Sequence, residues 1–429
     1  MLALASVCPA TAQQAPADQS QILQSLFDRV AALENRVGEL EKENHDLQAK
    51  LASSPTVTAG GPAVAPGSIV TPVPAPSPAA PAGLAQMPMP MPQAEAPSYP
   101  NMQFHGFADV EFASTDKKGQ PQGFSLGQFV PHISAALSPK TSVFAELSLT
   151  AHPTGYTAEV ERAIVRYDVN DYFKMSFGKY HTPVSYWNTA FHHGAWLQTT
   201  ISRPEMIQFG GRFLPVHFLG ALAEGAIPSG GLGLHYNAGF GNGRQTISLL
   251  GRDGDAGDSN SNRAWVAGLF ARPTSLYGLQ IGGSVYRDLI TPDSGSALHP
   301  QRELIASGHI VWTKERPELL AEFANVRHTD TLTGQVWNSQ GTYAQIAYRL
   351  PGAYKKWKPY YRFEYIHVPT TEPVLQFPNL EEHTVGTRFD IVDFAALKVE
   401  YRHVRRPLLQ QINGLELVNG FFAQTAFTF

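Results

Sequence analysis

Segment 182–230 gathers the side chains best suited to binding a ligand. It carries aromatic rings followed by guanidinium groups: Tyr186, Trp187, Phe191, Trp196, Arg203 and Arg212. Aromatic faces stack on sugar rings and on cations, and an arginine fork supplies directed donors. The same rings would also serve simply to pack the segment against the rest of the protein. The residues leave both roles open, and packing is the more ordinary one.

The same segment contains two adjacent histidines, His192 and His193. Imidazole is a common ligand for zinc and related metals. Adjacent side chains in an extended chain point to opposite sides, however, and no third ligand stands nearby in the sequence. We therefore expect no metal site and no cofactor.

Recognisable catalytic motifs are missing from the sequence. There is no G-x-S-x-G elbow, no H-E-x-x-H pair and no phosphate-binding glycine loop. The only cysteine, Cys8, falls in an apolar stretch that resembles the end of a secretory signal, with Ala10-Thr-Ala12 as the cleavage site and 1–12 as its remnant. The formal net charge of −4 does not favour a nucleic-acid partner. We expect a secreted protein that is not an enzyme.

Residues 101–429 alternate apolar and polar side chains, which predicts strands throughout. Leu397, Val399 and Tyr401, for example, alternate with Lys398, Glu400 and Arg402. We predict sixteen strands, at 102–114, 124–137, 141–152, 156–169, 172–181, 231–241, 244–253, 263–272, 278–289, 302–314, 317–329, 338–350, 357–368, 381–391, 395–406 and 419–429. Two further strands at Ile207–Arg212 and His217–Ala223 would make eighteen.

This pattern predicts an all-β fold, a sixteen-stranded antiparallel transmembrane β-barrel. No run of eighteen apolar residues occurs, which excludes helical spans. The last strand ends at Phe429 with an aromatic-rich face, and a barrel in a bilayer has both a use for such a face and no free edge. Short and long connections alternate, as between the two sides of outer-membrane barrels. The longest connection, 182–230, is the third on the long side.

Charged residues on the polar face should point into the barrel. The basic ones are Arg162, Arg166, Lys174, Arg252, Arg349, Arg362, Arg388, Lys398 and Arg402. The acidic ones are Asp109, Glu111, Glu146, Asp168, Glu318, Glu322, Glu364, Asp390 and Glu400. The two signs balance, whereas a highly selective pore shows a ring of one sign. Any of these charges could instead pair along the wall.

Two segments precede the strands. In 19–52, apolar residues recur at heptad spacing, which predicts a coiled coil: Leu23, Leu26, Val30, Leu33, Val37, Leu40, Leu47 and Leu51, with Asn44 also at a core position. Val at a, Leu at d and Asn44 favour two strands, whereas two successive R-h-x-x-h-E patterns favour three, through Arg29, Glu34, Arg36 and Glu41. We expect a trimer. Residues 53–100 are rich in Pro and Ala and should form an extended linker.

The sequence as a whole resembles trimeric outer-membrane porins with an N-terminal coiled-coil arm, near the phosphate-selective porin O/P superfamily. The features that carry this resemblance are the coiled coil, the linker, the sixteen strands, the long third loop and the terminal Phe429. The resemblance implies a loop that folds inward to narrow the channel, and a terminal Phe429 that assembly machinery recognises. The arginine ladder of the phosphate porins is not recoverable in this sequence, so phosphate selectivity is not expected.

We therefore expect a homotrimeric porin in the bacterial outer membrane that passes small hydrophilic solutes, with loop 182–230 as its constriction. The arm would lie in the periplasm, where it could reach peptidoglycan. The predicted partners are outer-membrane lipid, two further copies of the chain, the solutes and the barrel-assembly machinery. The alternatives are an anion- or sugar-preferring channel, a structural tether between outer membrane and cell wall, and a barrel enzyme.

Overall fold

The computed structural model describes residues 99–120, 122–152, 154–250, 254–375, 379–407 and 415–429, and before them only Glu39 and Lys42, which are α-helical. The chain divides into two units, 1–79 and 80–429, and the fold described below belongs to the second. The expected signal remnant lies outside the described residues, as do nearly all of the predicted coiled coil and linker. The same holds for Arg29, Glu34, Arg36, Glu41 and Arg252.

Sixteen β-strands make up most of the described chain. They are β1 (Asn101–Thr115), β2 (Gly123–Ala136), β3 (Thr141–His152), β4 (Gly155–Asn170), β5 (Phe173–His181), β6 (His217–Ile227), β7 (Leu234–Asn242), β8 (Ala264–Ala271), β9 (Leu279–Ile290), β10 (Gln301–Trp312), β11 (Glu318–Asp330), β12 (Val336–Ala347), β13 (Trp357–His367), β14 (Leu380–Val392), β15 (Ala395–Pro407) and β16 (Leu415–Thr428). Among the described residues from 99 onward, the α-helix is α2 (Tyr186–Phe191).

Short 3-10 turns complete the structure. They are η1 (Ala195–Leu197), η2 (Glu205–Ile207), η3 (Gly230–Leu232), η4 (Ile247–Leu249), η5 (Thr274–Leu276) and η6 (Gly352–Tyr354). Within the part of the chain that the structure describes, no helix combines the length and the apolar character needed to cross a bilayer.

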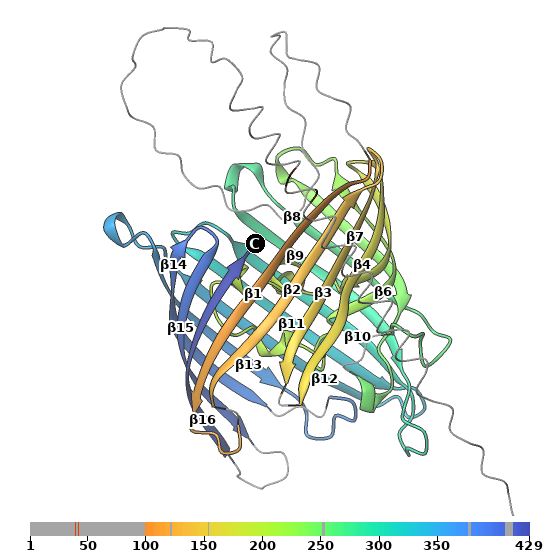
Figure 1. The fold of residues 1–429 in the computed structure, drawn as a ribbon. Coiled ribbons are helices and arrows are strands. Elements are labelled where there is room, and N and C mark those ends of the chain that lie inside the picture. The colour runs from red at the N-terminus through yellow and green to blue at the C-terminus, as the bar shows by residue number, and fades with distance from the viewer. Residues whose placement is uncertain are drawn as a thin grey trace, which may run out of the picture. The chain divides into compact units, whose positions relative to one another are not determined.

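The strands form one closed antiparallel barrel in chain order (Figure 1). The seam pairs β1 with β16, from Phe107 opposite Thr428 to Thr115 opposite Gly420. Closure leaves no strand with an unpaired edge, which is the condition for a sheet to cross a bilayer. The predicted sixteen-stranded barrel is confirmed.

The faces of the barrel are the reverse of those of a soluble protein. On β13, for example, Glu364 is 2% exposed and its neighbour Tyr365 is 42% exposed. The same contrast separates Glu400 (1%) from Tyr401 (46%) on β15. Successive side chains of a strand point to opposite faces, so the polar set faces inward and the apolar set outward. An apolar outer band with a polar interior is the arrangement of transmembrane barrels.

One predicted strand is wrong, and one that we gave only as part of the eighteen-stranded alternative, His217–Ala223, is present. Residues 217–227, which we placed in the long loop, form β6, and described residues of the predicted strand 244–253 form loop and η4. The loop after β5 therefore ends at Val216, and segment 207–212 is not a strand. One error adds a strand and the other removes one, so the count of sixteen holds and the alternative of eighteen does not.

Glycines weaken the strand pattern of β6 in the sequence. Gly weakens strand propensity, yet here two glycines allow backbones to approach closely. A Cβ on Gly220 would stand 2.3 Å from the carbonyl oxygen of Phe240, and one on Gly225 would stand 2.1 Å from that of Tyr172. These positions need glycine for space.

Gly220 and Gly308 offer a matched test of this point, because both are glycines in strand interiors. In Gly308→Ala the new Cβ meets its nearest atom, the carbonyl oxygen of Gly282, at 3.7 Å. We expect Gly220→Ala to lower the free energy of unfolding by about 1–3 kcal/mol, the usual cost of overpacking. Gly308→Ala should stay within about 0.5 kcal/mol of the parent. Urea titration followed by gel mobility measures both, and equal shifts would contradict the close approach at Gly220.

Candidate functional site

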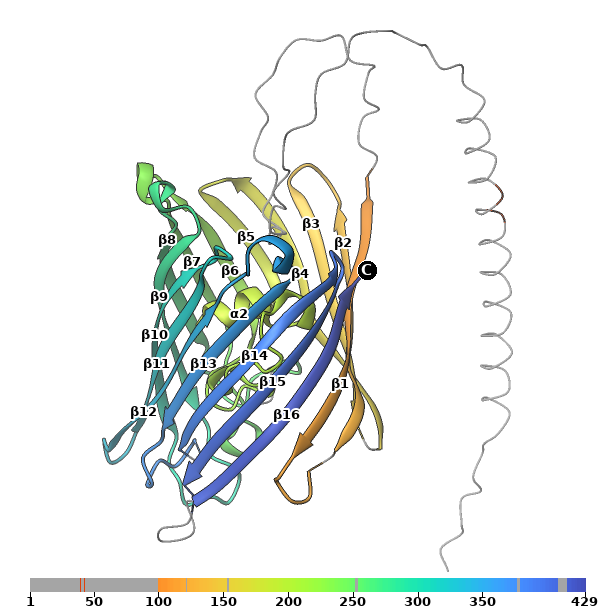
Figure 2. The ribbon, with the colours of Figure 1, turned by 90° about the vertical axis from the view of Figure 1, so that its left-hand side faces the viewer.

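Residues 182–216, called the inner loop below, join β5 to β6 and lie inside the barrel (Figure 2). The inner loop contains α2, η1 and η2. The helix begins after Ser185, whose Oγ accepts a hydrogen bond from the N–H of Asn188 at 3.3 Å. Serine favours this N-cap position because its side chain satisfies an N–H that the helix leaves unpaired.

A glutamate of the barrel wall completes the cap. The carboxylate of Glu322, on β11, accepts hydrogen bonds from the N–H groups of Tyr186 at 2.7 Å and Trp187 at 2.8 Å. It also accepts from the hydroxyls of Ser185 at 3.2 Å and Tyr343 at 2.6 Å. Three of these four donors belong to the start of α2, so one buried carboxylate joins the helix to the wall, and the donor from Tyr343 on β12 holds the carboxylate in place.

The middle of the inner loop is held by β13 and β15. Arg362 donates to the carbonyl oxygen of Ser202 at 2.7 Å and to Oγ1 of Thr200 at 3.1 Å. Glu400 accepts from the N–H of Ile201 at 2.9 Å and from Oγ of Ser202 at 2.8 Å. Donors and acceptors of the wall thus satisfy backbone groups that the irregular loop leaves unpaired, as buried polar groups require.

Two further cations hold the carbonyl groups around η1. Nη1 of Arg388 donates to the carbonyl oxygens of Trp196 at 2.6 Å and Gln198 at 2.9 Å. Nζ of Lys398 donates to the carbonyl oxygen of Thr200 at 2.9 Å. These side chains come from β14 and β15, so consecutive wall strands contact the same stretch of loop.

Ten of the charged residues predicted to line a pore point inward in the described chain, and each of these ten is already engaged. Those that contact the inner loop are Arg362, Glu364, Arg388, Lys398 and Glu400. The others form ion pairs along the wall: Arg162 with Glu146, Arg166 with Asp168 and Glu224, Lys174 with Asp168, Arg349 with Glu315 and Asp390, and Arg402 with Glu400. Wall pairing therefore describes most of the ten, because Arg362 also pairs with Glu364 and Arg388 with Asp390, and five of the ten contact the inner loop as well.

The loop aromatics divide between packing and partial exposure. Trp187 is 1% exposed and meets Tyr343 and Phe191 edge to face, with ring centroids 5.8 and 5.1 Å apart. Tyr186 packs against Phe191 and His309. The side chain of Trp196 is half-buried beneath the guanidinium of Arg388. A buried ring offers no stacking face to a solute, so Trp187 serves the packing role.

The two loop arginines differ sharply. Arg203 is buried, with its guanidinium 3.8 Å above the ring of Phe209, and burial lowers its pKa to about 9. Arg212 is exposed, and its backbone carbonyl accepts a hydrogen bond from Arg244 of the β7–β8 connection at 3.0 Å. Only Arg212 of this pair presents its side chain to water.

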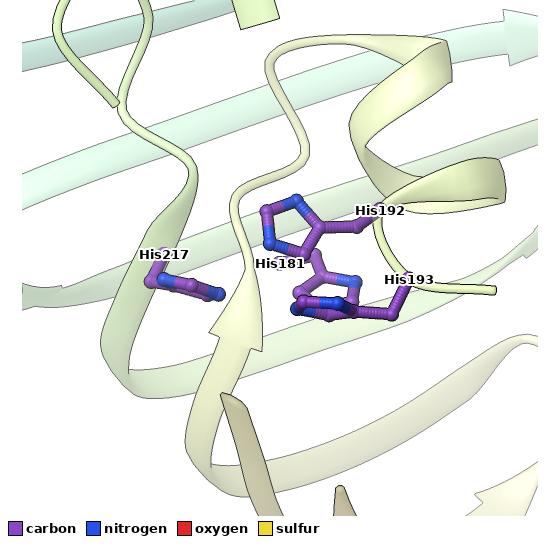
Figure 3. Close-up of side chains that lie close together, drawn as sticks. All are labelled: His181, His192, His193 and His217. Carbon is purple, nitrogen blue, oxygen red and sulfur yellow. The ribbon is translucent and has the colours of Figure 1, made fainter. Parts of the chain in front are cut away.

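Four histidines meet at the base of the inner loop (Figure 3). His181 ends β5 and His217 begins β6, and the two are direct cross-strand partners. His192 and His193 follow α2, and their ring centroids are 4.5 Å apart. Our expectation that these two side chains diverge is wrong, because the chain is still helical at His192 (φ −54°, ψ −49°) and not extended.

No protein-family model and no curated protein sequence matches the chain. Solved outer-membrane barrels share its fold. The chain superposes on OmpF of Salmonella typhi, solved in complex with daunomycin, with TM-score 0.54 and 10% identity over 77% of this chain and 98% of that one. The trimer form of OmpT, an outer membrane protein of Vibrio cholerae, gives 0.53 and 13% over 77% and 99%. The outer membrane channel DcaP of Acinetobacter baumannii gives 0.52 and 10% over 77% and 97%.

Proposed function

We propose that this chain is an outer-membrane porin through which small hydrophilic solutes diffuse passively. The observation that carries the proposal is a closed sixteen-stranded barrel, apolar outside and charged inside, with a long loop folded into it. Barrels of this strand number enclose more space than wall side chains fill, and in porins that space is an aqueous channel. The inner loop, 182–216, would be its constriction, and no chemical step or cofactor is needed for this function.

The shared fold supports the same proposal. One of the similar structures is described as a channel and another was solved as a trimer. We propose a homotrimer in the bacterial outer membrane, with the N-terminal coiled coil as a periplasmic arm near Arg29, Glu34, Arg36 and Glu41 that stabilises the trimer or reaches peptidoglycan. This is the architecture of the arm-bearing porins near the O/P superfamily that the sequence resembles.

The contacts of Phe429 support a role for this residue as an assembly signal. Its backbone exchanges two hydrogen bonds with Gly106, at 2.9 and 3.1 Å, and its ring stacks on Phe129 with centroids 5.5 Å apart. The ring is 45% exposed on the outer face at the seam. We propose that barrel-assembly machinery recognises this residue before β16 closes on β1.

Weak ion selectivity follows from the pairing of the wall charges. Because the inward arginines and lysines are hydrogen-bonded to loop carbonyls or to carboxylates, no ladder of free cations runs along the described wall. A ring of one sign is what makes a pore strongly selective. The chain is therefore proposed as a general diffusion porin and not as a phosphate- or sugar-specific channel.

Planar-bilayer recording of the purified chain tests the proposal. We expect stepwise, ohmic conductance and a small reversal potential in a potassium chloride gradient. A structural tether or a barrel enzyme would give no conductance steps, and that result would refute the porin. A reversal potential close to the Nernst value for either ion would refute weak selectivity and leave the channel standing.

A further inference from the structure

The four histidines form a compact group inside the barrel. One ring nitrogen from each of His181, His192, His193 and His217 lies within 4.8 Å of those of the others. The first three side chains are buried and that of His217 is nearly so. They come from β5, from the loop after α2 and from β6, and Figure 3 shows the rings turned toward a common centre. Convergence of four imidazoles from three segments is not a consequence of strand pairing alone.

Amide side chains orient two of these rings. Nδ1 of His192 lies 2.7 Å from Oδ1 of Asn188, and Nδ1 of His193 lies 3.2 Å from Oε1 of Gln128. An amide oxygen only accepts hydrogen bonds, so the contact with Gln128 places a proton on Nδ1 of His193 and turns its Nε2 toward the group. Nδ1 of His192 lies between the acceptor Asn188 and the donor Arg203, and its Nε2 also faces the group. Metal-binding histidines are held by outer partners in this way. Nε2 of His181 and Nε2 of His192 have no hydrogen-bond partner among the described residues.

A β-bulge supplies a carboxylate to the group. Between β3 and β4, Glu146 pairs with Arg162 and Leu147 pairs with Val160, so Glu161 is the extra residue. Bulges redirect side chains and are frequent beside functional sites. The bulge turns Glu161 inward, where its Oε2 lies 2.9 Å from Nε2 of His217, 3.1 Å from that of His193 and 4.0 Å from that of His192.

Among the described residues, no lysine or arginine forms an ion pair with the carboxylate of Glu161. All the described ion pairs of Glu161 are with histidines, and its other oxygen accepts a hydrogen bond from Ser148.

Other charges also face the cluster. Nη2 of Arg203 lies 3.1 Å from Nδ1 of His192 and opposes a second cation there. Glu146 lies 3.6 Å from Nε2 of His181 and is itself paired with Arg162. Arg203 is thus the repulsive neighbour of a cation at the centre, and Glu161 the attractive one.

We propose that His181, His192, His193 and His217 bind one divalent transition-metal ion of the zinc class, with Glu161 as the charge-balancing carboxylate. Imidazole nitrogens suit zinc, copper and nickel, and imidazole ligands carry no negative charge to balance a divalent ion, so one adjacent anion favours binding. Zinc–nitrogen bonds of about 2.0–2.1 Å require the ring nitrogens to draw inward by rotamer adjustment. The ion would fasten the end of α2 to both strands that bear the inner loop.

Metal content measures this proposal directly and does not depend on channel activity. The full chain, purified without a polyhistidine tag, is stripped with EDTA, loaded with zinc sulfate and dialysed, and bound zinc is counted by mass spectrometry. We expect one zinc per chain. Copper loading should give an electron-paramagnetic-resonance spectrum with coupling to several nitrogens. Less than stoichiometric zinc, or a copper spectrum without nitrogen coupling, would overturn the proposal.

Variants locate the ion. His192→Ala combined with His217→Ala should abolish stoichiometric zinc, whereas His383→Ala, on β14 and hydrogen-bonded to Tyr361 at 2.7 Å, should keep it. Gln128→Ala removes the contact that orients His193, together with a hydrogen bond to Thr150 at 3.2 Å, and leaves the four histidines in place. It should weaken zinc binding about 10–100-fold, since outer partners of metal ligands have effects of that size. Equal zinc content in the double variant and the parent would place the metal elsewhere. If the double variant does not fold, the Gln128→Ala affinity decides: an unchanged value overturns the site.

Discussion

Deletion of residues 186–208 is expected to raise the single-channel conductance several-fold. The deleted stretch includes α2, η1 and η2, together with the segment between η1 and η2 that Arg362, Arg388 and Glu400 hold. A sixteen-stranded barrel has room for an aqueous channel once its lumen is cleared. The wall residues that held the loop, such as Glu322 and Arg362, would then face water, so the barrel itself should still fold.

A second deletion controls for loop shortening as such. Residues 294–297 are exposed and lie in the connection between β9 and β10, away from the anchoring contacts described above. Removing them should leave conductance unchanged in the same planar-bilayer recording. Unaltered conductance after deletion of 186–208, with the folded barrel confirmed by gel mobility, would show that the inner loop is not the constriction.

Glu322→Ala is expected to cost about 3 kcal/mol of stability and to make the channel current noisy. The substitution removes the acceptor of three hydrogen bonds from the start of α2 and of one from Tyr343 on β12. Each buried donor left without a partner costs about 1–3 kcal/mol unless water reaches it. Water from the lumen would satisfy some of them, which keeps the total near the lower end of the sum. Urea titration and bilayer recording measure the two effects.

Glu381→Ala is the matched control, because it removes a wall carboxylate of the same kind in a different setting. Glu381 pairs with Arg405 at 3.1 Å, and both side chains are substantially exposed. Exposed ion pairs contribute about 1 kcal/mol or less, so this variant should resemble the parent. Similar losses in the two variants would mean that Glu322 has no special role in holding α2.

The barrel could be predicted because its physical signal is repeated in every strand. A face in contact with lipid and a face in contact with polar groups impose period two, and fifteen of the sixteen predicted segments overlap an observed strand. The two errors, the absent strand at 244–253 and the strand β6 that lay outside the sixteen, each have a local cause. In β6, Gly220 and Gly225 reduce the pattern because neighbouring backbones occupy the space of a side chain. In 244–253, alternation was present without a strand, since Arg244 turns to bind Glu303 at 2.7 Å.

The roles of the inward charges could not be predicted from one strand at a time. Alternation correctly turned Arg362, Arg388 and Lys398 toward the lumen, yet their partners are carbonyl groups of a loop about two hundred positions earlier in the chain. Lys398 and the carbonyl oxygen of Thr200, for instance, are separated by 198 residues. No short-range pattern encodes such a contact.

The histidine cluster was missed for a different reason. His181 and His217 are paired across β5 and β6, and that pairing exists only if β6 begins at His217. Placing β6 inside the loop separated the two residues that complete the set with His192 and His193. The signal that would have revealed the cluster is a histidine at the end of one strand and another at the start of the strand that pairs with it.

Anchoring of the inner loop by late strands has a consequence for the order in which the protein matures. The loop emerges long before β11, β13 and β15 supply Glu322, Arg362 and Glu400, so its docking must wait for the carboxyl-terminal half. Contacts between distant parts of a chain form slowly, because closing a long loop costs entropy before any bond rewards it. In an unfinished barrel the inner loop would therefore remain undocked, and its final arrangement inside the barrel would be the last part of the molecule to form.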